Sequence, residues 1–308
     1  MNNLNDNNLL ILLYHGVYEH ELNGIENYSG KHINKNDFVA QLQLLKNKNY
    51  NFLSFEEIVQ IIETGNKFPK KSVALSFDDG FYNNYKIACP ILDDFKIPTI
   101  FYVCSGLIGK KNLFWVDIIE ACINNCKQDI LDLKLDKIHR FNVKDIKTKI
   151  NTNEIIKKYC KRSKINIRDR VLKDLINITD IKPTPDMSVN YEIMNWKDLR
   201  EINNNDLFTV GGHNMFHDTF TNIEPENIYL EISNTIELIK KNLNSKVEHY
   251  SYPEGQASDY NSHVIDELKK QGIKCCPSAI YGFNSEISNL FHLKRIMPGF
   301  MNTKFPVT

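Results

Sequence analysis

Short apolar runs alternate with segments of helical periodicity along most of the chain. Strands are predicted over the apolar runs at residues 9–14, 72–77, 99–103, 207–210, 248–252, 274–277 and 290–297. Helices are predicted where apolar positions recur at helical spacing, over residues 35–48, 54–63, 83–95, 196–203, 224–243 and 259–271. This alternation is typical of an α/β barrel or of a layered sheet.

The segment 107–191 departs from this alternation. Apolar residues at helical spacing, such as Trp115 and Cys122, predict helices there, and strand signals are few. Between Lys110 and Lys182 there are 18 Lys or Arg against 10 Asp or Glu, a balance of +8. We predict a helical insertion over 107–191 within a single domain that spans residues 1–308. It is either a solvated insertion or a lid whose cations meet a phosphate-bearing substrate.

Composition limits the classes of partner. The 308 residues suffice for one large domain with an insertion. Lys and Arg number 38 and Asp and Glu also 38, so no global field attracts nucleic acid, and we predict no nucleic-acid partner. The 7 cysteines lack regular spacing, which indicates a reducing compartment without a disulfide framework. We expect pairs such as Cys275 and Cys276 to be small buried hydrophobes rather than ligands.

The N-terminal residues 1–8 contain no basic region, and the apolar run that follows is short. That run ends in Tyr14-His15-Gly16, so it is typical of a strand and not of a signal peptide. No stretch approaches the roughly 20 apolar residues that a membrane span requires. We therefore predict a cytoplasmic protein without a membrane span.

Candidate chemistry lies in two short motifs, each of which follows an apolar run. Asp78, Asp79 and Gly80 end the run 72–77, and His213 and His217 follow another. Alone, the first is typical of a solvated turn and the second of an exposed helix. Two His at the start of a helix would share one face at the spacing of a single metal ion. With one Asp they form a three-ligand site with an open position for water, and the second Asp is free to act as a base.

These motifs resemble those of the polysaccharide deacetylases, which share the NodB homology fold. Residues 76–80 are similar to the family's Thr-Phe-Asp-Asp-Gly motif, and 213–217 to its His-Ser/Thr-x-x-His motif with Asn in second place. Tyr252, Pro253, Glu254 and Gly255 resemble its Pro-x-Gly loop. The likeness spans roughly residues 9–106 and 191–300. It implies a distorted (β/α)7 barrel of the polysaccharide deacetylase type, here with a helical insertion.

The resemblance also implies roles for individual residues. Asp79, His213 and His217 would be the metal ligands, and Asp78 the general base. The backbone N–H of Glu254, within the loop 252–255, would help to hold the oxyanion. The ligands suit Zn²⁺ best, although Ni, Co, Fe or Mn also bind similar sets.

Two positions depart from the family pattern. The Arg that often orients the base, two residues before the Pro, is replaced by Ser251, and we predict that Arg295 supplies the guanidinium to Asp78 instead. The alternative is that Arg295 forms an ion pair at the surface. For the general acid we favour His15, at the end of the first strand, over His292 in Leu290-Phe291-His292. A structural His15 that donates to a carbonyl is the other interpretation.

The resulting prediction is a metal-dependent hydrolase that removes an N-acyl group, above all N-acetyl, from an amino sugar. The sugar could be part of a polysaccharide or be linked to a lipid or a nucleotide. Two alternatives remain: a deformylase or amidohydrolase acting on a small non-sugar amide, and an inactive barrel that binds glycans. The inactive barrel predicts loss of a ligand or of the base, yet Asp78, Asp79, His213 and His217 are all present.

Overall fold

The structure, a computed structural model, describes residues 7–306, in two compact units. Unit 1 contains the described residues up to Glu19, then Ser29–Lys110 and the described residues from Ile193 onward. Unit 2 consists of His20–Tyr28 and Lys111–Glu192. The prediction that the N-terminus is not a signal peptide rests partly on residues 1–6. These residues lie outside the described part of the chain. The assignment of both units to one catalytic domain stays a prediction.

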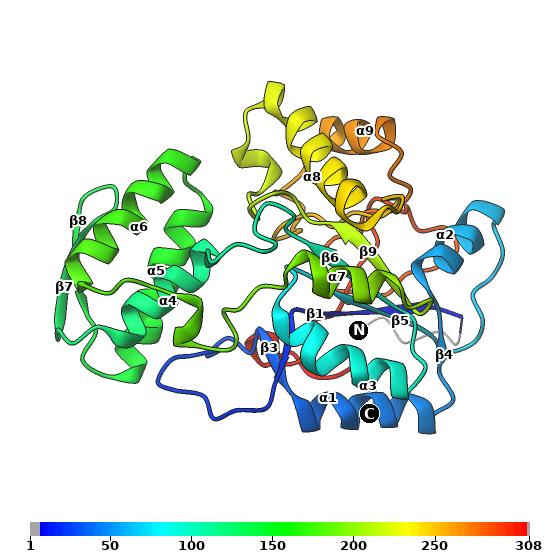
Figure 1. The fold of residues 1–308 in the computed structure, drawn as a ribbon, viewed down its shortest axis with the longest axis horizontal. Coiled ribbons are helices and arrows are strands. Elements are labelled where there is room, and N and C mark those ends of the chain that lie inside the picture. Colours follow the sequence, from blue (N-terminus) through cyan, green and yellow to red (C-terminus); the bar gives the residue numbers. More distant parts are fainter. Residues whose placement is uncertain (1–6, 307–308) are drawn as a thin grey trace. The chain divides into compact units, whose positions relative to one another are not determined.

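The core of unit 1 is a parallel sheet in the order β1-β5-β6-β9 (Figure 1). Its strands are β1 (Leu9–Tyr14), β5 (Ser72–Phe77), β6 (Thr99–Val103) and β9 (Phe208–Gly212), and the short β4 (Asn51–Phe52) pairs with the start of β5. Every residue of β1, β5 and β6 is buried. Continuous apolar runs of this kind are expected for parallel strands that are covered on both faces. The predictions for β1, β5 and β6 are confirmed at both ends.

The sheet closes into a barrel through segments that are not regular strands. Successive segments are joined by backbone hydrogen bonds from Gly212 to His249, Tyr250 to Cys275, Ser278 to Leu293 and Ile296 to Ile11. With β1, β5, β6 and β9, these segments make seven wall positions among the described residues, which confirms the predicted distorted (β/α) barrel. The strands predicted at 248–252, 274–277 and 290–297 are wrong in detail, because only isolated bridges form there. Each bridge in these described segments is single, and Pro277 has no N–H to extend a ladder.

Helices of unit 1 pack their apolar faces on this barrel. They are α1 (Lys35–Asn47), α2 (Phe55–Thr64), α3 (Cys89–Asp94), α7 (Trp196–Asn203), α8 (Ile228–Leu243) and α9 (Ser262–Lys270). The predicted capping box of α2 is confirmed, with Ser54 and Glu57 each bonded to the other's backbone N–H. The predicted helix 83–95 is instead a π-helix, Asn84–Ala88, followed by α3. Pro90 has no N–H to donate back along the helix, which favours this local widening.

Unit 2 has a hydrophobic core of its own. Helices α4 (Trp115–Asn125), α5 (Ile146–Lys161) and α6 (Ile165–Thr179) pack with an antiparallel hairpin of β7 (Ile130–Lys134) and β8 (Ile138–Asn142). The prediction of helices is confirmed, but the hairpin was missed. In β7 only Leu131 and Leu133 face inward, and a five-residue alternation among charged residues is a weak signal. The lid interpretation of this segment stays a prediction.

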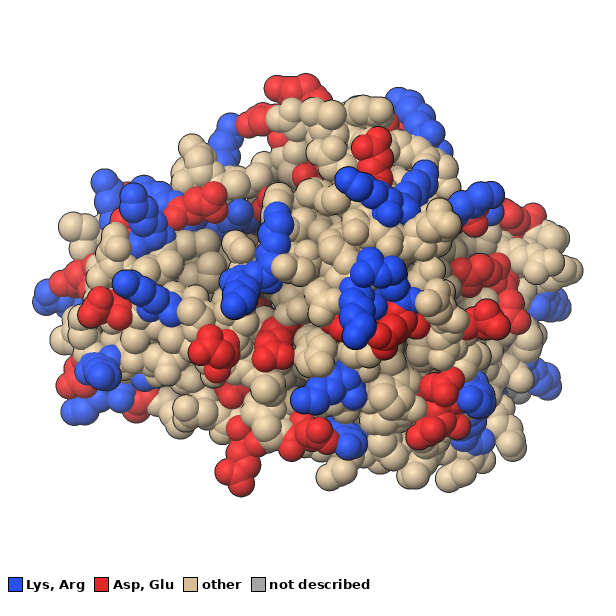
Figure 2. Space-filling model, viewed as in Figure 1, with Lys and Arg blue, Asp and Glu red and all other residues tan. Residues whose placement is uncertain are grey.

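Surface charges of both signs are mixed, and the cysteines of the described part of the chain are unpaired. Lys and Arg side chains alternate with Asp and Glu across the face shown in Figure 2. All seven cysteines, which lie within the described residues, are free and buried, as expected for small hydrophobes. Within residues 7–306, no helix combines the length and apolar character needed to cross a membrane.

The parallel register places the two candidate motifs at the same edge of the sheet. β5 ends at Phe77, directly before Asp78, and β9 ends at Gly212, directly before His213. Phe77 pairs with Phe101 of β6, and Val103 of β6 pairs with Gly212. The carboxyl ends of the barrel strands therefore bring residues 78–79 and 213–217 together.

We predict that Ile11→Ala lowers the free energy of unfolding by about 2–5 kcal/mol, because it leaves a cavity in the barrel. Ile11 is fully buried in β1, where it packs with Ile100 and Leu293. Ile287, which is 89% exposed, is the matched control, and Ile287→Ala should change stability by less than about 0.5 kcal/mol. Urea unfolding measures both; equal losses would contradict the burial of β1.

Candidate active site

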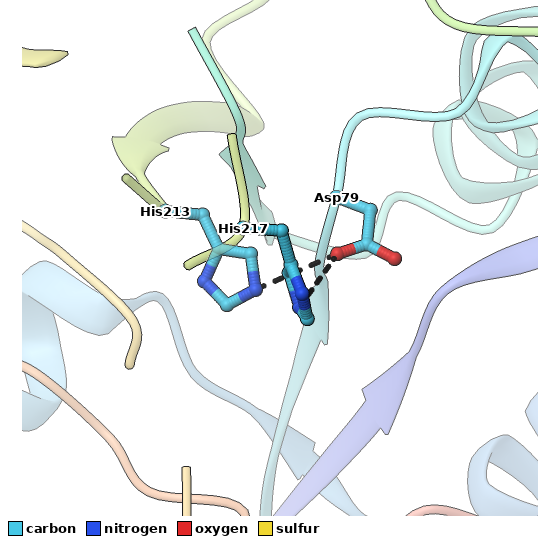
Figure 3. A group of neighbouring side chains, drawn as sticks. All are labelled: Asp79, His213 and His217. Atoms are coloured by element: carbon cyan, nitrogen blue, oxygen red, sulfur yellow. Dashed lines mark ion pairs between the residues drawn. The ribbon is translucent and has the colours of Figure 1, made fainter. Parts of the chain in front are cut away.

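Three side chains converge at the carboxyl edge of the barrel (Figure 3). Oδ1 of Asp79 lies 3.5 Å from Nε2 of His213 and 3.4 Å from Nε2 of His217. Two ligand atoms bound to one zinc ion at about 2.1 Å, with tetrahedral angles, lie about 3.4 Å apart. All three residues are buried. The donor set and its spacing therefore fit a single divalent metal ion.

The loop that carries the two histidines is not the start of a helix, so that part of the prediction is wrong. Asn214 and His217 both have φ of 62°, in the left-handed region that no right-handed helix contains. The loop is attached to the segment after β6, where the Ser105 N–H donates to the Asn214 carbonyl and the Gly106 N–H to the Met215 carbonyl. The imidazoles converge because this loop bends back, and not because they share a helix face.

His213 is held in the form that binds metal. Its Nδ1–H donates to the backbone carbonyl of Ser251 at 2.8 Å, which leaves the lone pair of Nε2 facing Asp79. Burial lowers the pKa of His213, although the nearby Asp78 carboxylate opposes that shift. A neutral imidazole with its other nitrogen bonded to a carbonyl is the usual state of a histidine ligand.

Asp78 forms a buried, two-pronged ion pair with Arg295. Both terminal guanidinium nitrogens donate to the carboxylate at 2.8 Å, and Arg295 is only 1% exposed. We predicted this contact because Ser251 stands where the family often has an Arg. Arg295 does not form the alternative surface ion pair. Burial alone would raise the pKa of Asp78, but the charge and hydrogen bonds of Arg295 outweigh it and lower the pKa to about 2. Asp78 is therefore ionised at neutral pH.

Three serines surround this pair, and sequence reasoning missed their roles. The Ser251 hydroxyl donates to Asp78 at 3.2 Å and accepts from Arg295 at 2.8 Å. Ser76 accepts from the same guanidinium at 3.2 Å, and the Ser278 carbonyl accepts from its Nε at 2.7 Å. The sequence indicated these contacts only through the missing Arg at position 251, because an isolated serine forms no recognisable pattern.

The two candidate acids lie in different surroundings. His15, between β1 and β2 (Gly16–Tyr18), is close enough to Asp78, His213 and His217 for their charges to affect its pKa. Burial is the main cause that lowers the pKa of His15, to about 3, so its imidazole is neutral at pH 7. His292 is exposed and hydrogen-bonds to the Tyr260 hydroxyl at 2.9 Å. Among the described residues, His292 makes no hydrogen bond to the cluster.

The predicted Pro-x-Gly loop forms a tight turn beside the cluster. Glu254 and Gly255 have φ of 60° and 64°, and the Gly255 N–H donates to the Pro253 carbonyl at 2.7 Å. The Ser251 carbonyl, two residues before Pro253, accepts from Nδ1 of His213, so the turn lies beside the cluster. Tyr252 is buried, and its hydroxyl donates to the Phe291 carbonyl. The role of the Glu254 N–H as oxyanion donor stays a prediction.

Fold and site together define a parallel α/β barrel with an Asp/His/His cluster and a paired carboxylate at the carboxyl ends of its strands. A family model described as polysaccharide deacetylase matches residues 65–276. That match covers more than half of the chain, so the chain belongs to the polysaccharide deacetylase family.

Individual relatives are similar over shorter stretches. The poly-beta-1,6-N-acetyl-D-glucosamine N-deacetylase of Staphylococcus aureus strain N315 is 36% identical over 95 residues, which are 31% of this chain and 31% of that protein. The enzyme of the same name from Staphylococcus epidermidis is 32% identical over 124 residues, 37% of this chain and 42% of that protein. The matched part thus spans less than half of either relative.

Solved structures share the fold. The Streptococcus pyogenes deacetylase PplD, in complex with acetate, superimposes with a TM-score of 0.60 at 18% identity, over 96% of this chain and 94% of that one. IcaB from Ammonifex degensii gives a TM-score of 0.61 at 17% identity, over 95% of this chain and 92% of that one. At these identities the likeness establishes the barrel.

We predict that Arg295→Met lowers the free energy of unfolding by about 3–5 kcal/mol at pH 7, because Asp78 would remain as an uncompensated buried charge. The loss should shrink as the pH falls through 4 toward 2. The native pKa of Asp78, about 2, lies below its unfolded value, so the pair stabilises the fold above that window and is lost within it. Unfolding by urea as a function of pH measures this.

Arg140 supplies the matched control for this prediction. It makes the same two-pronged contact with Asp132, at 2.9 Å for each bond, but both side chains are exposed. Arg140→Met should leave stability nearly unchanged at every pH, because water replaces an exposed pair. If both Arg variants lost the same stability, burial would not be what makes the Asp78 pair important.

Proposed function

We propose that the protein is a metal-dependent hydrolase that removes N-acetyl groups from an N-acetylglucosamine polymer. The observation that carries this proposal is the buried cluster of Asp79, His213 and His217 next to the ionised Asp78. Family membership supports a carbohydrate deacetylase, and the names of the relatives support a poly-β-1,6-linked polymer as substrate. Neither supports a nucleotide or lipid carrier, so the proposal is confined to the polymer.

Asp79, His213 and His217 would hold the metal, with zinc as the best match to two imidazoles and one carboxylate. When bound, such an ion lowers the pKa of a water molecule and polarises the acyl carbonyl. The chain's own contribution begins with Asp78, whose oxygen lies 3.9 Å from Nε2 of His213 and can therefore accept the proton of a water held there. Arg295 and Ser251 fix the direction of that carboxylate.

The remaining steps concern charge on the acyl oxygen and on the amine. The N–H of Glu254, in the turn beside the cluster, would donate to the oxyanion as it forms. His15 would deliver a proton to the departing amine. Its low pKa means that it must first receive that proton, and the proton balance is met by the one that Asp78 accepts from the water. The nearby Asp78 carboxylate favours the protonated form of His15.

The proposal is tested by metal content and by acetate release from poly-N-acetylglucosamine. We expect about one equivalent of a divalent metal and measurable deacetylation in the wild type, and loss of both in His213→Ala/His217→Ala, because two of three ligands are gone. Asp78→Asn should keep the metal but lose turnover by about 10²–10⁴-fold, since the base is missing. Elemental analysis and an acetate assay measure these two properties separately.

The matched control is His263→Ala, which removes an exposed imidazole on α9 and should change neither property. A wild-type protein that holds no metal after reconstitution would contradict the proposal and favour a barrel that only binds glycans. Full turnover by Asp78→Asn would remove Asp78 as the base while leaving the metal site intact.

A separate prediction concerns the proton donor. His15→Gln should slow the release of acetate from the polymer by about 10²–10⁴-fold at unchanged metal content, whereas His292→Gln should have little effect. The loss should largely disappear with 4-nitrophenyl acetate, because a nitrophenolate leaves without a proton. An equal loss on both substrates would show that His15 supports the site in another way, and a larger effect of His292→Gln would reverse the assignment.

A further inference from the structure

The loop between the two candidate histidine ligands contains Asn214, where the family pattern has Ser or Thr. Its contacts indicate how His217 is kept in place, an inference that rests on the metal site proposed above. The backbone N–H of Asn214 donates to the Tyr250 hydroxyl at 2.8 Å, and that hydroxyl donates to Oδ1 of Asn214 at 2.6 Å. Nδ2 of Asn214 donates to the carbonyl of Asp218 at 2.6 Å.

These three hydrogen bonds close the loop around His217. The bond to Asp218 crosses the turn from one end to the other, and the two bonds to Tyr250 attach the turn to the barrel. His217 lies inside the closed turn and has left-handed backbone geometry, with φ of 62°. Non-glycine residues occupy that region only when the surrounding structure holds them there. Asn214 shares that geometry, which asparagine tolerates better than most residues.

Tyr250 is itself held rigidly. Its side chain is fully buried, and its N–H donates to the Cys275 carbonyl at 3.0 Å in the wall of the barrel. The ring lies directly against Gly212, where an added Cβ would come within 2.5 Å of the ring carbon Cε2. Gly212 therefore leaves the room that the ring needs, immediately before His213. The hydroxyl of this buried ring therefore lies at the ligand loop, where it bonds to Asn214.

We propose that Tyr250 is a positioning residue for the metal site, which acts on His217 through Asn214. Within the described part of the chain, its hydroxyl bonds to Asn214 and makes no hydrogen bond to the ligand donor atoms or to Asp78. Its loss should therefore weaken metal binding by about 10–100-fold, the usual effect of removing a group that orients a ligand. The intrinsic chemistry of the metal-loaded enzyme should change much less than its affinity for the metal.

The test compares Tyr250→Phe with Tyr14→Phe in the full chain. Each variant removes one buried hydroxyl, but that of Tyr14 donates to Gln41 of α1 and has no connection to the ligand loop. The dissociation constant for Zn²⁺ is measured by competition with a chelating dye, and urea unfolding of the apo-protein records any general loss of stability. We expect zinc affinity to fall about 10–100-fold in Tyr250→Phe and less than about twofold in Tyr14→Phe.

Asn214→Gly gives a second variant that keeps the left-handed backbone accessible but removes the side-chain bonds. It should also weaken zinc binding. Wild-type zinc affinity in both Tyr250→Phe and Asn214→Gly, with no binding by His213→Ala/His217→Ala, would overturn the positioning role while the metal site stands. Unchanged affinity in the double histidine variant would instead overturn the proposed metal site, and this inference with it.

Discussion

The buried pair of Asp78 and Arg295 is the contact on which the rest of the site depends. It joins the end of β5 to the segment that closes the barrel, 217 residues later in the chain. Such a pair contributes little net stability, because desolvation of two charges offsets most of their attraction, but loss of either partner is severe. The pair therefore acts mainly as a geometric constraint. Where the barrel closes, residues 290–296 lie beside β1, and the Arg295 guanidinium contacts Asp78. Asp79, the next residue in the chain, then faces the two histidines.

The same pair sets the electrostatics of the site. Arg295 keeps Asp78 ionised despite its burial, with a pKa of about 2, and burial keeps His213 neutral. A neutral imidazole is the protonation state that a metal ion requires of a histidine ligand, and an ionised carboxylate is the state that a base requires. There is a cost, because a carboxylate of such low pKa is a weak proton acceptor. Asp78 can serve as a base only for a water whose own pKa is lowered, so the proposed base and the proposed metal depend on each other.

Four residues with left-handed backbone geometry lie at the cluster. Asp79, Asn214, His217 and Glu254 all have positive φ, and each either contributes to the candidate site or lies directly beside it. Non-glycine residues adopt this geometry at a cost of the order of 1 kcal/mol each. They retain it only where other contacts hold them. Here those contacts come from the barrel wall, from the Gly106 N–H and the Tyr250 hydroxyl, while Gly212 makes room for the Tyr250 ring. The rigid barrel thus supports two loops that would not hold these shapes alone.

The sequence by itself determined the elements whose signal is local. Continuous apolar runs defined β1, β5 and β6 at both ends, the Ser54–Glu57 pair defined the start of α2, and the motifs at 78–80 and 213–217 identified the residues that the structure brings together. The presence of Ser251 where the family often has an Arg also indicated the contact between Arg295 and Asp78. What only the tertiary structure decided rests on contacts between distant residues. The closing segments form single bridges rather than strands, the histidine loop is bent by left-handed residues and not helical, and Ser76, Ser251 and Tyr250 acquire partners far away in sequence. A local pattern cannot encode such contacts, because a buried hydroxyl has no periodicity and its partner is chosen by how the barrel closes.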